Sequence, residues 1–372
     1  MRLLALNWRD PRNPEAGGAE VHLHEILRRT VSQGHSVTQV SQAVRGLPRE
    51  EIIDGVRILR HGRRNTFNFS VKRFALSLDM KENYDLVIED LCKIPFYSPA
   101  WSPVPVLTVV PHLFGTTAYR EVAFPLALYV NLMEWFIPRV YSGCPFVAIS
   151  DSTKEDLARR GIPRESIAVI PCGIDTDVYT PGEPEAERGT FLYVGRLKKY
   201  KGIHLILEAL AILHAGGTDC RLVVLGTGDY EEELKKRSSY LGLDGAVSFE
   251  GFVPLERKLY WLRRAWAAVF PSEKEGWGLT VIEANACGTP VIASDSEGLR
   301  DSVSNGSTGI LVPHGSIEDL ADKMKKLIEE PNIRKRLGEQ AIQWAGNFSW
   351  DTTAEKMLKE MEAAADSVSR SG

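Results

Sequence analysis

Short apolar runs alternate with longer amphipathic stretches in the first half of the chain. The runs at residues 2–8 (RLLALNW), 84–90 (YDLVIED) and 104–111 (VPVLTVVP) are typical of buried strands. Residues 19–33 carry apolar side chains at helical spacing, which predicts an amphipathic helix. Because strands separated by helices or crossovers form parallel sheets covered on both faces, this half predicts a doubly wound α/β domain.

A second series of the same kind begins at residue 190. Its predicted strands include 190–196 (TFLYVGR), 220–226 (CRLVVLG) and 267–272 (AAVFPS). Segment 176–189 is rich in proline, glycine and charge and has no period, so it is predicted to link the two halves. Two such halves predict a cleft between them, since ligands of open parallel sheets bind beyond the carboxyl ends of the strands.

Composition narrows the class of protein. The formal net charge is −4 over 372 residues, so the molecule as a whole does not attract nucleic acid. Its five dispersed cysteines form no C-x-x-C pair, which argues against a zinc site or a disulfide framework and favours a reducing compartment. The N-terminal apolar run is too short for a signal sequence, and no stretch reaches the ~18 apolar residues of a membrane span. These features indicate a cytoplasmic protein.

Two cations follow the first strand of the second half. Arg196 and Lys201 come directly before a predicted helix at 203–215, and cations beside a helix N-terminus can hold a diphosphate. The alternative is a solvated basic loop. After the next strand, Gly226 permits close approach of a ligand, although an ordinary turn explains it as well.

Two features of the first half also lie just before a predicted helix or just after a predicted strand. Gly17 and Gly18 precede the helix at 19–33, where backbone N–H groups can face an anion; the alternative is a turn with a helix cap. His112 directly follows the strand at 104–111, at the edge where ligands bind. A single histidine is more often structural than catalytic, so both interpretations stay open.

In the segment EKEGWGLTVIEANACGTPVIASD, residues 273–295, Glu275 and Glu283 lie eight positions apart. Two glycines within three residues place Glu275 in a loop, and Glu283 falls one turn into the next helix. The N–H groups of residues 276–279 open that helix and can face an anion. Carboxylates on both sides of an anion site suit a nucleotide-sugar, with hydroxyls at each end and phosphates between. The alternative is an exposed acidic face.

The order of these segments resembles retaining glycosyltransferases of family 4, which have the two-domain GT-B fold. The resemblance spans nearly the whole chain and rests on LYVGRLKKYKGIHLILEAL (192–210), LVVLGTGDY (222–230), residues 268–295 and NGSTGILVP (305–313). In this family Glu275 and Glu283 correspond to the E-x7-E signature. The motifs are specific for the family and much less so for the substrate.

The resemblance implies a role for each candidate residue. Glu283 would bind the donor ribose, and Glu275 the hydroxyls of the transferred sugar. The backbone amides of Gly18 and of the helix start would contact the donor, as would the glycine loops. The cations would hold the leaving diphosphate, and His112 would lie beside the transferred sugar. The full predicted set is Gly17, Gly18, His112, Arg196, Lys201, Gly226, Glu275, Gly276, Trp277, Gly278, Leu279 and Glu283.

The resemblance also implies an organisation and a mechanism. Residues 1–175 would bind the acceptor and residues 176–350 the donor, with a last helix at about 351–368 packed back on the first domain. No carboxylate stands out as a nucleophile, so retention is expected by a front-face route with an oxocarbenium-like species. The donor would be UDP- or GDP-linked, and with its phosphates held by cations no metal or other cofactor is expected.

Two residues depart from the family pattern. Cys172 replaces the usual asparagine before the GID sequence, which is expected to affect a turn rather than chemistry. Trp277 stands between the signature glycines where a smaller aromatic residue is common, and its wider ring is expected to reshape the sugar pocket.

The acceptor, a hydroxyl of unknown context, should bind the first half. Residues 60–76 interleave basic and aromatic side chains, and residues 124–142 form a strongly apolar helix that contains Arg139. This combination suits peripheral contact with an anionic membrane. The alternative is a basic loop over a buried core helix.

Two rival functions are a nucleotide-sugar epimerase of the same architecture and a non-catalytic nucleotide-sugar-binding protein.

Overall fold

The computed structural model describes every residue except 65, 183–185, 187–188 and 370–372. The chain forms two compact units. The first comprises Met1–Gly173 together with the C-terminal segment from Trp350, and the second is Ile174–Ser349. Part of the predicted linker, residues 183–185 and 187–188, lies outside the described residues.

The first unit is an eight-stranded sheet in the order β3-β4-β2-β1-β5-β6-β7-β8. Every described neighbouring pair is parallel except β3 and β4, an antiparallel edge hairpin that the sequence pattern did not reveal. Its strands are β1 (Arg2–Leu6), β2 (Ser36–Gln42), β3 (Glu50–Ile53), β4 (Val56–His61), β5 (Leu86–Asp90), β6 (Val106–Val110), β7 (Phe146–Ala148) and β8 (Ile167–Val169). Its helices are α1 (Gly18–Ser32), α2 (Phe67–Leu76), α3 (Met80–Asn83), α4 (Ala118–Glu121), α5 (Phe124–Trp135), α6 (Ile137–Val140), α7 (Asp151–Arg159) and α15 (Trp350–Ser369).

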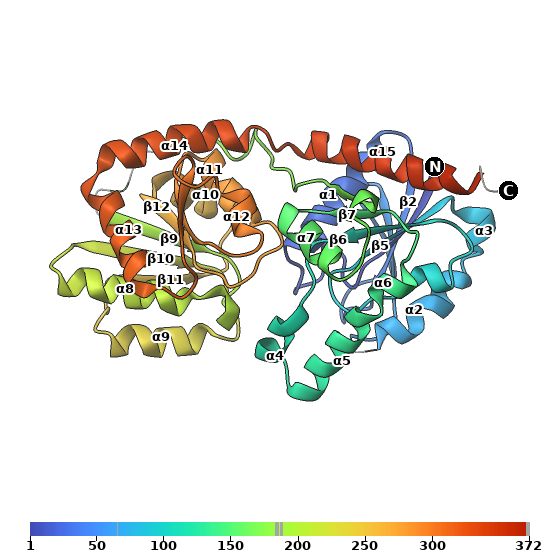
Figure 1. The fold of residues 1–372 in the computed structure, drawn as a ribbon, viewed down its shortest axis with the longest axis horizontal. Coiled ribbons are helices and arrows are strands. Elements are labelled where there is room, and N and C mark those ends of the chain that lie inside the picture. Colours follow the sequence, from blue (N-terminus) through green and yellow to red (C-terminus); the bar gives the residue numbers. More distant parts are fainter. Residues whose placement is uncertain (65, 183–185, 187–188, 370–372) are drawn as a thin grey trace. The chain divides into compact units, whose positions relative to one another are not determined.

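Helices cover both faces of this sheet because β1 is apolar and buried from Leu3 to Leu6. Leu3 packs with α1 and α15, whereas Leu4, which points to the other face, packs with α2. The last helix therefore returns to the first unit and lies against α1, as Figure 1 shows. Arg29 on α1 binds Asp351 on α15 at 2.6 Å.

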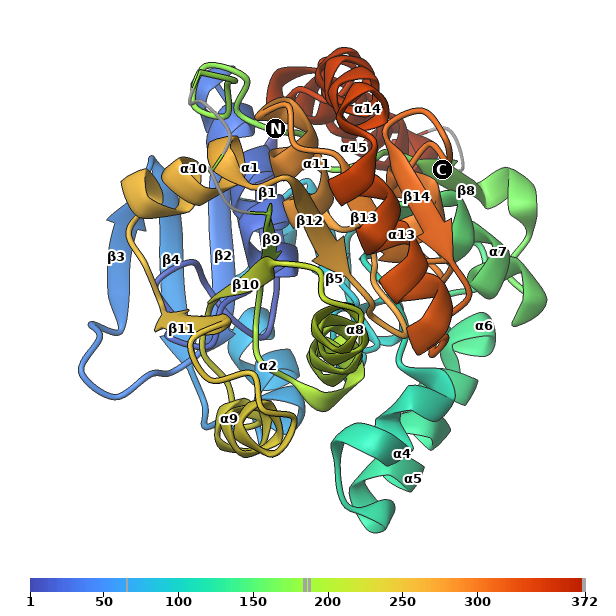
Figure 2. The ribbon, with the colours of Figure 1, turned by 90° about the vertical axis from the view of Figure 1, so that its left-hand side faces the viewer.

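The second unit is a six-stranded, fully parallel sheet in the order β11-β10-β9-β12-β13-β14. Its strands are β9 (Gly189–Val194), β10 (Cys220–Leu225), β11 (Val247–Gly251), β12 (Ala267–Phe270), β13 (Val291–Ser294) and β14 (Gly309–Val312). Its helices are α8 (Ile203–Ala215), α9 (Glu231–Tyr240), α10 (Leu255–Arg264), α11 (Leu279–Ala286), α12 (Leu299–Ser302), α13 (Ile317–Glu329) and α14 (Pro331–Ala345). Figure 2 shows α8 beside α13, and these two helices pack against each other, as do α11 and α14.

The prediction of two doubly wound α/β domains is confirmed. In the second unit the chain runs outward from β9 through β10 to β11, then restarts at β12 on the other side of β9. This reversal is the topological switch point of the sheet, where the loops after β9 and β12 leave in opposite directions and where ligands of such sheets bind. The candidate residues Arg196, Lys201 and Glu275 lie on these two loops.

Candidate functional site

An ion pair joins the two loops at the switch point of the second unit. Lys201 Nζ lies 2.5 Å from Glu275 Oε1, and both side chains are largely buried. Burial lowers the pKa of Lys201, but the charge and the hydrogen bond of Glu275 outweigh it, so that the pKa lies above its ordinary value. The amine is therefore protonated at neutral pH, and a buried cation stands where the predicted diphosphate would bind.

Glycines let the backbone of these loops approach closely. Gly202, at a φ of +70° before α8, has no room for a side chain, because a Cβ atom would lie 2.4 Å from the carbonyl oxygen of Pro271. A Cβ on Gly226 would lie 2.0 Å from the carbonyl oxygen of Gly195. The loop after β10 thus rests directly on the loop after β9, and Gly226 has a packing role whether or not a ligand touches it.

Arg196 lies on the same loop as Lys201, between β9 and α8. Its side chain is exposed, and its carbonyl oxygen accepts a hydrogen bond of 3.1 Å from the hydroxyl of buried Tyr193. The structure thus brings Lys201 and Glu275 together and places Arg196 five positions before Lys201 on the loop between β9 and α8.

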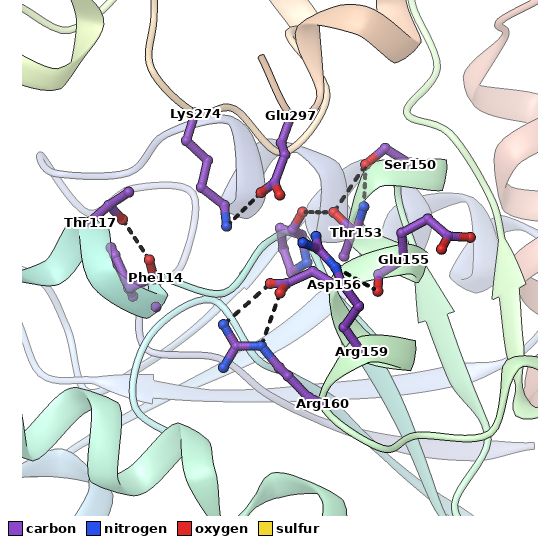
Figure 3. A network of polar contacts seen from close by, with 12 residues as sticks. Phe114, Thr117, Ser150, Thr153, Glu155, Asp156, Arg159, Arg160, Lys274 and Glu297 are labelled. Carbon is purple, nitrogen blue, oxygen red and sulfur yellow. Dashed lines mark hydrogen bonds and ion pairs between the residues drawn. The ribbon is translucent and has the colours of Figure 1, made fainter.

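The Glu275 loop is braced by the segment after β13. The backbone N–H of Glu275 donates to the carbonyl of Glu297 at 3.0 Å. Lys274 and Glu297 form an ion pair of 2.8 Å, drawn in Figure 3. Gly298 lies so close that a Cβ atom there would sit 2.3 Å from the carbonyl oxygen of Glu275. Sequence reasoning did not single out these supports, which come from residues beyond the predicted motif.

This close approach predicts that Gly298→Ala destabilises the protein more than Gly306→Ala. Both glycines have nearly the same φ, +79° and +78°, but nothing lies within 4 Å of a Cβ at Gly306. The shared backbone strain should cost about 1 kcal/mol, and the clash at Gly298 about 1–3 kcal/mol more. Urea denaturation of the two variants measures the difference. Equal urea midpoints for the two variants would show that the Glu275 loop moves away from the added side chain without a measurable loss of stability.

The start of α11 follows Glu275 directly. Gly278 precedes the helix with a φ of +95°, a conformation that favours glycine. The N–H groups at the start of a helix have no partner within it, so Leu279 can present its amide to an anion, whereas Gly276 and Trp277 lie in the loop before the helix. Trp277 is buried and packs edge-on against Phe348, with ring centroids 5.2 Å apart. This packing weighs against the expectation that its ring shapes a sugar pocket.

Glu283 has its own pair of partners. Its Oε1 accepts a hydrogen bond from the Tyr179 hydroxyl at 2.8 Å, and its Oε2 lies 2.6 Å from Lys258 Nζ. The Tyr179 hydroxyl also accepts from Lys258 Nζ at 3.2 Å, which closes a three-membered polar group. Burial, followed by the negative charge of Glu283, raises the pKa of Tyr179, so the phenol stays protonated and donates.

Tyr179 and Lys258 are candidate site residues that sequence reasoning missed. Tyr179 lies 104 positions before Glu283 and inside the segment predicted to be a linker, so no spacing pointed to it. Arg263 Nε donates to the carbonyl of Thr180, which fixes this segment on the second unit. The helix α10 brings Lys258 to the same carboxylate.

The remaining predicted residues lie in the first unit. Gly17 caps α1 and Gly18 begins it, but the N–H of Gly17 already donates to Glu20 Oε2 at 2.7 Å. His112 follows β6, and its ring lies 5.5 Å from that of Phe114 in an edge-on arrangement. Cys172 is buried, consistent with a packing role in its turn.

The switch point of the first unit, between β1 and β5, holds a buried polar cluster that the sequence did not identify. Asn7 Nδ2 donates to Asp90 Oδ2 at 2.7 Å, and both side chains are buried. Burial, helped by the charges of Glu20 and Glu89, raises the pKa of Asp90 well above its usual range. Burial also lowers the pKa of nearby Lys93 to about 8. Among the described residues, no group of three or more His, Cys, Asp or Glu side chains has metal-binding geometry.

Family models match both halves of the chain. Residues 16–178 match the model described as Glycosyltransferase Family 4, and residues 181–344 match Glycosyl transferases group 1. A D-inositol 3-phosphate glycosyltransferase of Frankia alni is 33% identical over 218 residues, which are 54% of this chain and 54% of that protein. One of Arthrobacter sp. is 34% identical over 215 residues, 54% of this chain and 51% of that protein. The chain thus matches about half the length of these curated relatives.

Solved structures resemble the fold over nearly its whole length. Sucrose-phosphate synthase from Thermosynechococcus elongatus superposes with a TM-score of 0.82 at 23% identity, covering 96% of this chain and 98% of that one. Anabaena HepE in complex with UDP and glucose superposes with a TM-score of 0.75 at 20% identity, covering 98% and 100%. At these identities the likeness establishes the fold, GT-B with two Rossmann-like domains.

Proposed function

This chain belongs to glycosyltransferase family 4, and we propose that it transfers a hexosyl group from a nucleoside-diphosphate sugar to an acceptor hydroxyl with retention of configuration. The observation that carries the proposal is the buried Lys201–Glu275 pair at the switch point of the second unit, directly before the amides that open α11. A protonated amine, an exposed arginine on the same turn and a helix N-terminus form a strong anion site.

The ion pair between Lys201 and Glu275 suggests how the donor would bind. A diphosphate beside Lys201 would replace Glu275 as its partner, since phosphate oxygens accept the same charge-assisted hydrogen bonds. Glu275 would then be released to accept hydrogen bonds from sugar hydroxyls. Glu283, held by Tyr179 and Lys258, would accept hydrogen bonds from the ribose diol.

The chemical step is proposed to follow a front-face route. The bond between the anomeric carbon and the phosphate oxygen breaks, and the acceptor oxygen attacks the oxocarbenium-like carbon from the same side. The acceptor proton passes to the departing phosphate oxygen. Arg196, Lys201 and the α11 amides would stabilise the charge that develops on the leaving group, the kind of electrostatic term that dominates many enzymes. With cations in this position, the proposal includes independence from metal ions.

The donor is proposed to be UDP- or GDP-linked. HepE, which shares the fold, was solved with UDP and glucose, which favours testing UDP-glucose first. The acceptor is proposed to be a hydroxyl of a glycan, a glycolipid or a small molecule, D-inositol 3-phosphate among them because of the names of the relatives. The setting is proposed to be the cytoplasm, with peripheral contact at the membrane surface.

A thermal shift screen tests the donor proposal. A donor at about 100 times its Kd stabilises the folded state by about 2.7 kcal/mol, which corresponds to a rise in Tm of about 5–10 °C. We expect such a rise with one of UDP-glucose, UDP-galactose, UDP-N-acetylglucosamine or GDP-mannose, and a similar rise in the presence of EDTA. No rise with any of these donors would contradict the proposal.

Release of nucleoside diphosphate separates the rival functions. A transferase should release it slowly from the bound donor alone and faster when an acceptor is added. An epimerase of the same architecture would convert the donor into an isomeric nucleotide-sugar without net release of nucleoside diphosphate, and a binding protein would release none and leave the sugar unchanged. A strict loss of activity in EDTA would overturn the metal-independent route but not transfer itself.

A further inference from the structure

The helices α4 and α5 of the first unit carry a concentrated apolar surface. Only Ala127 and Glu134 of α5 are buried, and Phe124 and Trp135 keep 68% and 55% of their surface exposed. The large apolar side chains exposed in this segment are Tyr119, Val122, Phe124, Leu126, Leu128, Leu132, Trp135 and Phe136. The alternative of a buried core helix is therefore wrong for α5, although Ile137 and Tyr141, at the end of the segment predicted as one helix, are buried. Soluble monomers rarely expose contiguous apolar patches of this kind without a partner.

The apolar side chains form a stripe along the helix. Phe124, Leu128, Leu132 and Trp135 follow one another at spacings of four, four and three, which places them on one face. Figures 1 and 2 both show α4 and α5 standing away from the strands of their own unit. We call this stripe, together with the exposed side chains of α4, the α5 face.

The α5 face is held firmly from its other side. The buried carboxylate of Glu134 accepts hydrogen bonds from the N–H groups of Phe114 and Gly115 at 2.7 and 2.9 Å. Arg160 lies 3.1 Å from the same carboxylate and also binds Asp156 on α7, as drawn in Figure 3. The apolar side chains thus stand on an anchored helix.

Cations border this surface. The guanidinium of Arg139 lies 4.0 Å from the centroid of the Trp135 ring. Asn68 on α2 donates to the Tyr129 hydroxyl of α5 at 3.1 Å, which joins the two helices. Next to Asn68, Phe69 is 71% exposed, and one turn on, α2 exposes Lys72 and Arg73. Residues 62–78 include four basic and no acidic side chains, and Glu134 is the only acid between 122 and 140.

We propose that the α5 face docks on the surface of an anionic lipid bilayer, with the stripe from Phe124 to Trp135 in the acyl boundary and the cations of α2 at the headgroups. Apolar side chains rimmed by cations are what binding in the membrane interface requires. A helix of twelve residues is too short to span a bilayer, and no described helix is long and apolar enough to do so.

A bilayer fits this surface better than a second copy of the chain. A second copy would bring an equally cation-rich surface to the α5 face, and like charges around one interface oppose association. An anionic headgroup layer offers the opposite charge over the same area. The docking does not depend on glycosyl transfer, because lipid binding requires neither donor nor acceptor.

Flotation with vesicles tests the proposal. The full chain should float with vesicles of phosphatidylcholine and phosphatidylglycerol, and much less with phosphatidylcholine alone. The double variant Leu128→Asp/Leu132→Asp should lower the bound fraction by about tenfold or more, since it removes two inserted apolar side chains. The matched control is Ile52→Asp, an apolar-to-acidic change at a side chain that is 74% exposed on β3. It should bind as the unchanged protein does.

A second variant tests the proposal independently, in case the first variant does not fold. Lys72→Glu/Arg73→Glu leaves α5 intact and should weaken binding to anionic vesicles, as high salt should, because both remove electrostatic attraction. Circular dichroism and Tm should be unchanged in both variants. Wild-type protein that stays unbound to anionic vesicles overturns the proposal. So does a dimer that the Leu128→Asp/Leu132→Asp change dissociates in the absence of lipid.

Discussion

Replacement of Lys201 by alanine is expected to lower turnover by about 10²–10³-fold while donor affinity falls much less. Removing one preorganised stabiliser of a developing negative charge costs about this factor. The amine is largely buried and kept protonated by Glu275, so it is in place before the donor binds. Its attraction for the diphosphate increases as the sugar–oxygen bond breaks and charge accumulates on the leaving oxygen. Lys201 therefore stabilises the transition state more than the bound donor, and its loss lowers kcat.

The matched control for this prediction is Lys199→Ala. Lys199 lies on the same turn, two residues earlier, and its side chain is exposed. This variant should keep most of its activity, which would separate a specific role of Lys201 from a general loss of positive charge. Arg196→Ala should behave like Lys201→Ala if both cations hold the diphosphate. A loss of donor binding with unchanged turnover would show that Lys201 acts in the ground state only.

Replacement of Glu283 by glutamine is expected to raise the KM for the donor by about 10–100-fold with a smaller effect on kcat. Hydrogen bonds to a charged group are worth about 1.5–3 kcal/mol, and the variant keeps the shape of the side chain but loses the charge. The ribose does not change during transfer, so its contacts contribute equally to the substrate complex and the transition state. Steady-state kinetics over a range of donor concentrations measures both constants.

The control here is Tyr179→Phe, which removes one hydrogen bond and leaves the carboxylate beside Lys258. Because Tyr179 orients Glu283 through its Oε1, we expect a smaller rise in KM than for Glu283→Gln. The two changes should be less than additive in the double variant, since they act on one group. A fall in kcat with an unchanged KM in Glu283→Gln would place this carboxylate at the reacting sugar instead of the ribose.

Much of the fold follows from local patterns. The buried strands β1 and β5 each contain a short apolar run, Leu3–Leu6 and Leu86–Ile88, and such runs bounded by polar residues predict strands of a parallel sheet. The loops with Arg196, Lys201 and Glu275 follow such strands, and parallel strands bring their carboxyl ends to one edge. For this reason the sequence predicts that these residues share a site. The sequence pattern did not predict β3 and its hairpin with β4, because β3 is short and none of its side chains is fully buried.

The sequence by itself determined the two doubly wound domains, the family and the loops that face the switch point, because strand burial, turn glycines and motif spacing are local properties. Only the tertiary structure decided the partners of each carboxylate. Lys201, on the loop after β9, contacts Glu275, on the loop after β12, and Tyr179 contacts Glu283 from 104 residues away. It also decided that α5 is exposed, since an apolar helix has the same sequence in a core as on a surface. Contacts between distant segments depend on how the chain packs, and no local pattern records them.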